Sequence, residues 1–281
     1  MSPQLRQRIA FIVLGLCTAI VLIPVFLIMF ILIERGLMAI NWEFLTKMPR
    51  MGMRAGGIFP AIVGTIYLVT GTVMIALPLG LLAAIYLVEY AKGNWLTRMI
   101  EVAIVNLAGV PSVVYGLFGL GLFVIFLNLG ASILAGSLTL SIMILPVIIT
   151  ASREALSTVP KSFREASLAL GVSKWQTIWH VVLPNAIAGI LTGTILGVSR
   201  AAGETAPILF TVAAFYLPKL PRSVFDQCMA LPYHLYVLST QVPNVNPKIQ
   251  YGTALVLVSL VFIMNLVAII IRAQFRRKKQ W

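Results

Sequence analysis

The segment that decides the fold reads REALSTVPKSFREASLALGVSKWQTIWHVVLP, from Arg153 to Pro184. It is a polar stretch between two apolar runs, and it contains two signals for helix starts. Ser162 is followed three residues later by Glu165, and such a pair forms a capping box at the first turn of a helix. Ser173 and Gln176 repeat this spacing. Because Gly171 between the pairs can adopt the left-handed conformation that ends a helix, the segment predicts two short helices joined at a glycine.

The sequence around this segment is too apolar for a soluble protein. Of 281 residues, 60% are hydrophobic and 10% are charged, and the mean hydropathy is +0.99, whereas soluble domains carry about 25% charged residues. A membrane-spanning helix needs about 20 mainly apolar residues. Six apolar runs are candidates, at approximately 10–33, 58–87, 99–129, 137–151, 186–212 and 252–271. The predicted fold is an all-α membrane protein with six transmembrane helices in one domain, residues 1–281. Segment 153–184 joins the fourth helix to the fifth.

Two of these runs are longer than a straight span requires. The second and third each contain about 30 residues, or roughly 45 Å of helix, so tilted or kinked helices are expected. Pro78 and Pro111 are the expected kink points, because proline removes a helical hydrogen bond.

The charges are few and strongly biased, with 21 Lys and Arg against 8 Asp and Glu. In a soluble protein the net charge of +13 would suggest a nucleic-acid partner. Here the basic residues are too sparse to form a phosphate-tracking stripe, so no nucleic-acid partner is expected. An excess of Lys and Arg marks the cytoplasmic loops of membrane proteins. That excess falls on the start of the chain, the second and fourth connections and residues 272–279, which predicts that both termini lie in the cytoplasm, although the first outer loop is also basic.

The segment between the fourth and fifth runs resembles the EAA loop of ABC importer permeases. The matching residues are Glu165, Ala166, Ser167, Gly171, Val181, Leu183 and Pro184. The family pattern has a second alanine where this chain has Ser167 and isoleucine where it has Val181. The resemblance implies a type I ABC importer permease fold whose coupling helix docks to a separate ATPase subunit through Glu165, Ala166, Gly171, Leu183 and Pro184. Taken locally, Glu165 could simply cap its own helix and Gly171 could simply end it. The full spacing favours docking.

Further segments are similar to phosphate-importer permeases, and specifically to the PstA type. They are residues 109–119, 152–156, 199–207 and 231–241, and the similarity covers about residues 57–252. The resemblance implies a location in the bacterial cytoplasmic (inner) membrane and transport of inorganic phosphate across the lipid bilayer. It also implies three kinds of partner: a second permease of the PstC type, a PstB-type ATPase dimer and an extracytoplasmic PstS-type phosphate-binding protein.

Three charged residues are candidates for the transport pathway. Arg200 and Glu204 lie inside the fifth apolar run, where a charge is costly unless it is paired or solvated. Four residues apart, they would share a helical face and could simply neutralise each other. Alternatively, the Arg200 guanidinium could bind phosphate oxygens while Glu204 holds it in place. Arg153 follows the fourth run and is either a surface anchor or, as the resemblance implies, a residue on the exit route. Glu101 is expected to pair with the nearby Arg98.

No cofactor or metal is expected on this chain. His180 and His234 have no neighbouring Cys, His or carboxylate at metal-ligand spacing. The chain has no Gly-x-x-x-x-Gly-Lys-Ser/Thr motif, so ATP would be used by the partner ATPase. Three alternatives remain: an ABC permease for sulfate or molybdate, an ATP-independent secondary carrier, and an intramembrane enzyme. No Ser/His pair and no carboxylate pair at useful spacing supports the enzyme.

Overall fold

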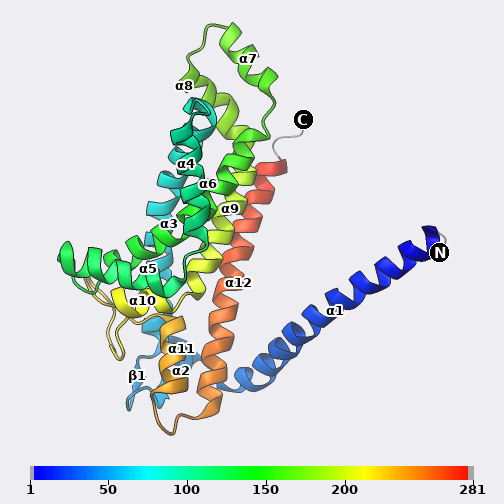
Figure 1. The fold of residues 1–281 in the computed structure, drawn as a ribbon. Coiled ribbons are helices and arrows are strands. Elements are labelled where there is room, and N and C mark those ends of the chain that lie inside the picture. The colour runs from blue at the N-terminus through cyan, green and yellow to red at the C-terminus, as the bar shows by residue number, and fades with distance from the viewer. Residues whose placement is uncertain (1–2, 278–281) are drawn as a thin grey trace.

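A computed structural model describes residues 3–277, and it is almost entirely helical (Figure 1). Its α-helices are α1 (Pro3–Gly36), α2 (Trp42–Thr46), α3 (Phe59–Ile85), α4 (Trp95–Ala108), α5 (Ser112–Gly119), α6 (Ile133–Ser157), α7 (Lys161–Ala169), α8 (Lys174–Thr177), α9 (Leu183–Gly203), α10 (Ala206–Thr211), α11 (Leu231–Thr240) and α12 (Pro247–Arg277). A short 3-10 turn, η1 (Leu37–Ala39), follows α1, and π-helical turns extend three other helices: η2 (Tyr86–Tyr90), η3 (Leu120–Phe126) and η4 (Ile178–Val182). The strands β1 (Pro49–Arg50) and β2 (Ala55–Gly56) form one antiparallel hairpin, with Pro49 opposite Gly56.

The helices confirm the predicted all-α membrane fold. Within the described part of the chain, five helices are long and apolar enough to cross a membrane, and a sixth span exists if α4 and α5 count as one. In Figure 1, α3, α6, α9 and α12 run side by side, with α7 and α8 at one end of the bundle. The hairpin, α2 and α11 lie at the other end. We call these the α7 end and the α11 end.

Helix α6 forms the centre of the bundle. Five of the largest fully buried side chains lie on it: Leu140, Met143, Ile144, Ile148 and Leu156. It packs against α3 on one side and α9 on the other, and small residues bring these helices close together. A Cβ atom at Gly80 of α3 would lie 2.7 Å from Ile148, and one at Gly193 of α9 would overlap Ala151. Small residues are typical of helix contacts in membranes, where close packing replaces the hydrophobic effect.

Replacing Gly193 with leucine is therefore expected to force α6 and α9 apart. Overpacking of this kind costs about 1–3 kcal/mol, so the midpoint of thermal unfolding in detergent should fall. Gly121→Leu is the matched control, because a Cβ at Gly121 meets no atom within 4 Å. Equal midpoints for the two variants would contradict the close α6–α9 contact.

Helix α1 touches the rest of the chain only near its C-terminal end. Gly36 is buried, and a Cβ there would lie 2.8 Å from the carbonyl oxygen of Tyr251 on α12. The most apolar stretch of the helix buries none of its residues, and Figure 1 shows α1 leaning away from the bundle. Its apolar surface is therefore available to lipid or to another chain.

Three of the six predicted ranges differ most from the helices observed. The run 137–151 belongs to a longer helix, α6, which starts at Ile133 because Ser132 caps it by accepting the backbone N–H of Ala135. The run 99–129 is not one kinked helix: α4 and α5 meet at an angle of 103°. Pro111 lies at this break, as predicted, whereas Pro78 lies inside the unbroken helix α3. The run 186–212 is also divided, because α9 ends at Gly203 and α10 begins at Ala206.

Candidate functional site

The charged pair in the fifth run lies where α9 ends. Arg200 is in the last turn of α9, and Glu204 is the extended residue that caps the helix. The Nε atom of Arg200 is 3.5 Å from Oε1 of Glu204, and the two side chains are 35% and 19% exposed. The predicted pair therefore exists, but the predicted shared helical face does not. The chain leaves the helix between the two residues, so the guanidinium keeps donors free of Glu204.

Two breaks in the helices lie close to this pair. The first is between α4 and α5, and the second is between α9 and α10. Gly116 of α5 packs directly on the second break, since a Cβ there would lie 3.0 Å from Ala206 O and from Pro207 Cα. Across the first break, the Tyr115 hydroxyl donates a hydrogen bond of 2.6 Å to the carbonyl of Leu107. Discontinuous helices that meet at membrane depth are a recurring way to build substrate sites in transporters.

A neighbouring polar contact links α9 to the last helix. The Ser199 hydroxyl donates a hydrogen bond of 2.6 Å to Oδ1 of Asn265 on α12. Sequence reasoning did not single out Asn265. The available signal was a lone amide side chain in the apolar run 252–271. Its contact with the residue next to Arg200 adds α12 to the elements that support the charged pair.

Arg153 lies apart from Arg200, nearer the α7 end. Its guanidinium is 2.8 Å from Glu101 Oε1 on α4, and the side chains are 43% and 30% exposed. The expected Glu101–Arg98 pair is wrong, because the contact between α4 and α6 gives Glu101 a stronger partner from outside its own helix. Since Gly193 faces Ala151 across the α6–α9 contact, Arg153 is displaced from Arg200 by roughly two to three helical turns at 3.6 residues per turn.

The segment at the α7 end contains one of the two predicted capping boxes. Ser173 accepts the backbone N–H of Gln176, and the Gln176 side chain accepts from the Ser173 N–H, as predicted. The Ser162–Glu165 box is wrong. Pro160 occupies the cap position of α7 and helix begins at Lys161, so Ser162 is already inside the helix.

Gly171 ends the first of the two helices, as predicted. Its φ angle is +80°, a left-handed conformation that glycine adopts without strain. The second helix is not short, because α8, η4 and α9 form one continuous helix, Lys174–Gly203. Pro184 cannot donate a helical hydrogen bond, and the π-helical turn η4 ends two residues before it, at Val182. A hydroxyl contact of 2.9 Å between Ser167 and Thr177 holds α7 against α8, so serine at the departure from the family pattern has a structural role.

The five predicted docking residues fall into two groups. Glu165, Ala166 and Gly171 are exposed at the α7 end. Leu183 and Pro184 are half-buried in the first turn of α9, where Leu183 packs against a core cluster that includes Ile85 and Leu156. The first group forms an accessible surface. The second lies inside the continuous helix Lys174–Gly203, where Leu183 anchors that helix to the core.

The two histidines lie in different environments and do not meet. His180 Nδ1 is 3.0 Å from the carbonyl oxygen of Gln176 at the α7 end. His234 on α11 is buried, which lowers its pKa to about 4, so its imidazole is neutral near pH 7. Among residues 3–277, no three His, Cys, Asp or Glu side chains form a group that could hold a metal ion.

Comparison with known proteins connects this arrangement to a transport family. Residues 76–280 match the family described as "Binding-protein-dependent transport system inner membrane component". The probable ABC transporter permease YqgI of Bacillus subtilis is 34% identical, over 95% of this chain and 95% of its own length. The phosphate transport system permease PstA 1 of Mycobacterium tuberculosis (strain H37Rv) is 36% identical, over 93% of this chain and 85% of its own length.

A solved structure supports the same fold. A chain from inward-facing MetNI methionine ABC transporter superposes with a TM-score of 0.57, covering 78% of this chain and 94% of that one, at 16% identity. At that identity the likeness concerns the fold alone. The family match extends over most of the chain and the relatives align along nearly their whole length, so this chain belongs to the family of binding-protein-dependent transport system inner membrane components.

Proposed function

We propose that this chain is the PstA-type permease subunit of an ATP-driven phosphate importer, and that it forms part of the pathway for inorganic phosphate. The observation that carries the proposal is Arg200, a half-buried guanidinium at the end of a broken membrane helix. Arginine is always charged and presents its donors in a planar fork that suits phosphate oxygens. The relatives called phosphate transport permeases, at 36% and 39% identity, support the choice of anion.

Glu204 would keep the binding of phosphate weak. Its contact with Arg200 at 3.5 Å holds the guanidinium in place and competes with the anion for the same positive charge. Transport requires a site that attracts its substrate and also releases it. An arginine without a carboxylate partner at this depth would bind the anion too tightly to release it. With Glu204 beside it, Arg200 can return to the carboxylate when phosphate leaves.

Arg153 would be a later contact for the anion. It lies nearer the α7 end than Arg200, and its side chain is 43% exposed, so phosphate could reach it. The arrangement repeats that of the first pair, since Glu101 again offsets the positive charge at 2.8 Å. The two pairs would form successive weak sites along one route.

The α7 end would be the docking surface for the ATPase. In this proposal Glu165, Ala166 and Gly171 contact a PstB-type ATPase dimer, and Leu183 and Pro184 orient the surface. ATP is used by that partner and not by this chain. A PstC-type permease would complete the pathway, and a PstS-type binding protein would deliver phosphate at the α11 end. Residues 1–281 form one permease domain, with both termini and the α7 end in the cytoplasm of a bacterial cell.

Uptake of labelled phosphate by membrane vesicles that contain the assembled complex tests the substrate. We expect uptake that requires ATP and the binding protein, and that unlabelled phosphate suppresses. A hundredfold excess of sulfate or molybdate should leave uptake unchanged, because the fully ionised dianions cannot donate a hydrogen bond as a phosphate monoanion can. Suppression by sulfate or molybdate would assign the permease to another oxyanion, and uptake without the ATPase would identify a secondary carrier.

A further inference from the structure

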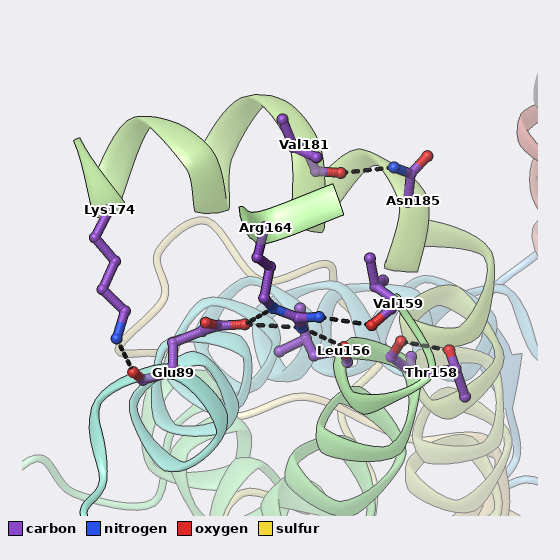
Figure 2. Close-up of polar contacts among 9 residues, drawn as sticks. Glu89, Leu156, Thr158, Val159, Arg164, Lys174, Val181 and Asn185 are labelled. Atoms are coloured by element: carbon purple, nitrogen blue, oxygen red, sulfur yellow. Dashed lines mark hydrogen bonds and ion pairs between the residues drawn. The ribbon is translucent and has the colours of Figure 1, made fainter. Parts of the chain in front are cut away.

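Arg164 of α7 points into the protein, although its neighbour Glu165 is exposed. Figure 2 shows its guanidinium directed between the ends of two membrane helices. The side chain is only 17% exposed. A buried arginine is expensive in a protein interior unless each donor finds a partner.

The guanidinium binds one carboxylate and two backbone carbonyls. Its Nε and Nη2 atoms both lie 2.9 Å from Oε1 of Glu89, which is 7% exposed. Nη1 donates to the carbonyl of Val159 at 2.6 Å, and Nη2 donates to that of Leu156 at 2.8 Å. The last carbonyls of a helix have no partner within it; Leu156 lies in the last turn of α6, and Val159 lies two residues past its end at Ser157. Arg164 therefore neutralises a buried charge and completes the end of α6 at once.

These contacts join three elements that are far apart in the sequence. Glu89 belongs to η2, the continuation of α3, while Leu156 belongs to α6 and Arg164 to α7. A second cation acts on the same turn from α8. The Lys174 ammonium donates to the backbone carbonyl of Glu89 and lies 4.7 Å from the centre of the Tyr90 ring. The turn after α3 is thus held from both helices of the proposed docking segment (Figure 2).

The ends of α3 and α6, which Arg164 contacts, are connected to the Arg200 site through the packing of α6 on α9. Helix α6 packs along both α3 and α9, with Gly193 against Ala151, and a Cβ atom at Gly197 would lie 3.5 Å from both Ile144 and Ile148. Without Arg164, the short connection between Ser157 and Lys161 and the apolar packing of Phe163 against the cluster around Leu156 would still join α7 to α6. Apolar packing lacks the directionality of hydrogen bonds, so it would let α7 shift relative to α6. With Arg164 in place, a push on α7 displaces the ends of α3 and α6 together.

We propose that Arg164 and Glu89 are positioning residues that lock α7 to the ends of α3 and α6, so that movement of the ATPase reaches the transport pathway. The proposal rests on the docking role assigned above to the α7 end. It differs from a general stabilising role in one respect. A lock of this kind sets the amount of phosphate moved per ATP hydrolysed, which stability alone does not change.

Replacing Arg164 with methionine tests the lock in the assembled complex. We expect the ATPase to stay bound and to hydrolyse ATP, while phosphate transported per ATP falls roughly tenfold, within the usual range of couplings between sites. The KM for phosphate should stay unchanged, because Arg164 lies outside the pathway. Lys161→Met is the matched control, since Lys161 is an exposed cation on the same helix. A wild-type ratio in Arg164→Met would overturn the proposal.

Two further variants separate the lock from a simple ion pair. Arg164→Lys keeps the positive charge but lacks the planar guanidinium with its several donors. It should therefore retain only part of the wild-type ratio of phosphate transported to ATP hydrolysed. The exchange Glu89→Arg with Arg164→Glu should recover none, because a carboxylate cannot donate to the carbonyls of Leu156 and Val159. Full recovery in the exchange would contradict the arrangement. If the complex with Arg164→Met does not assemble, Glu89→Gln is used as the test variant. A wild-type ratio of phosphate transported to ATP hydrolysed in Glu89→Gln would overturn the proposal.

A distance measurement tests the lock without any transported substrate. Spin labels at Leu170, beside α7, and at Leu82 of α3 occupy side chains that are 83% and 53% exposed. The labels require prior replacement of Cys17 and Cys228, the two cysteines of the chain. We expect one narrow distance with and without ATP, and a broad distribution in Arg164→Met. A broad distribution in the labelled but otherwise unmodified protein would refute the lock. A narrow distribution in a complex that fails to take up phosphate in the uptake assay would refute only the proposed substrate.

Discussion

Replacing Arg200 with glutamine is expected to reduce phosphate uptake by roughly 10- to 100-fold, the range set by loss of a hydrogen bond to a charged group. Glutamine keeps much of the side-chain length and some hydrogen-bonding capacity, but it has no positive charge. Glu204 would then be an unpaired carboxylate at membrane depth and would repel the anion. Uptake of labelled phosphate by vesicles containing equal amounts of complex measures the effect.

The control for this prediction is Arg98→Gln. Arg98 is also an arginine of a membrane helix, but it is exposed near the start of α4. Its replacement should leave uptake within about twofold of wild type, as surface charges usually contribute little. Equal uptake by wild type and Arg200→Gln would remove Arg200 from the pathway. A loss that Arg98→Gln shares would point to general assembly defects.

Replacing Gly171 with valine is expected to release the ATPase subunit from the permease. A Cβ at Gly171 would meet no atom within 4 Å, so the change removes no contact and creates no clash. The effect comes from the backbone alone, because φ is +80° and left-handed geometry costs a residue with a Cβ atom roughly 1–2 kcal/mol. The turn between α7 and α8 should open and disturb the surface formed by Glu165 and Ala166. Co-purification of the ATPase with the tagged permease measures the loss.

Gly171→Asn distinguishes the need for a left-handed backbone at this position from the need for a residue as small as glycine. Asparagine enters the left-handed conformation more readily than other residues with side chains, so this variant should retain most of the bound ATPase. Equal release in both variants would show that the surface needs the small size of glycine. Retention in both would mean that the geometry of this turn does not control docking.

Features with a local physical cause could be predicted from the sequence. Membrane helices follow from hydropathy alone, and the turn at Gly171 and the Ser173–Gln176 cap follow from residues at most three positions apart. The break at Pro111 was also located correctly. The Ser162–Glu165 box was predicted by the same rule and was wrong, because Pro160 starts the helix two residues earlier. A capping signal identifies a helix start only where no competing signal precedes it.

Features that depend on distant partners could not be predicted. Hydropathy does not distinguish one span from two half-helices. Apolar residues predominate on both sides of Gly203, so the division of run 186–212 could not be predicted from hydropathy. The partner of Glu101 proved to be Arg153 and not Arg98. The Arg164–Glu89 and Ser199–Asn265 contacts join residues 75 and 66 positions apart. No rule of sequence spacing covers such distances, since the packing of the helices decides which polar groups meet.

The break between α4 and α5 has a consequence for how the cell maintains this protein. Helix α4 buries none of its side chains within the chain, and the ends of both half-helices carry backbone groups without helical partners. In hydrocarbon each such group costs several kcal/mol, and irregular backbone persists there only when protein or water covers it. In the proposed complex the second permease covers this surface, so a newly inserted copy without it would be an unassembled subunit exposed to membrane proteases. The scarcer of the two permeases would set how many transporters survive.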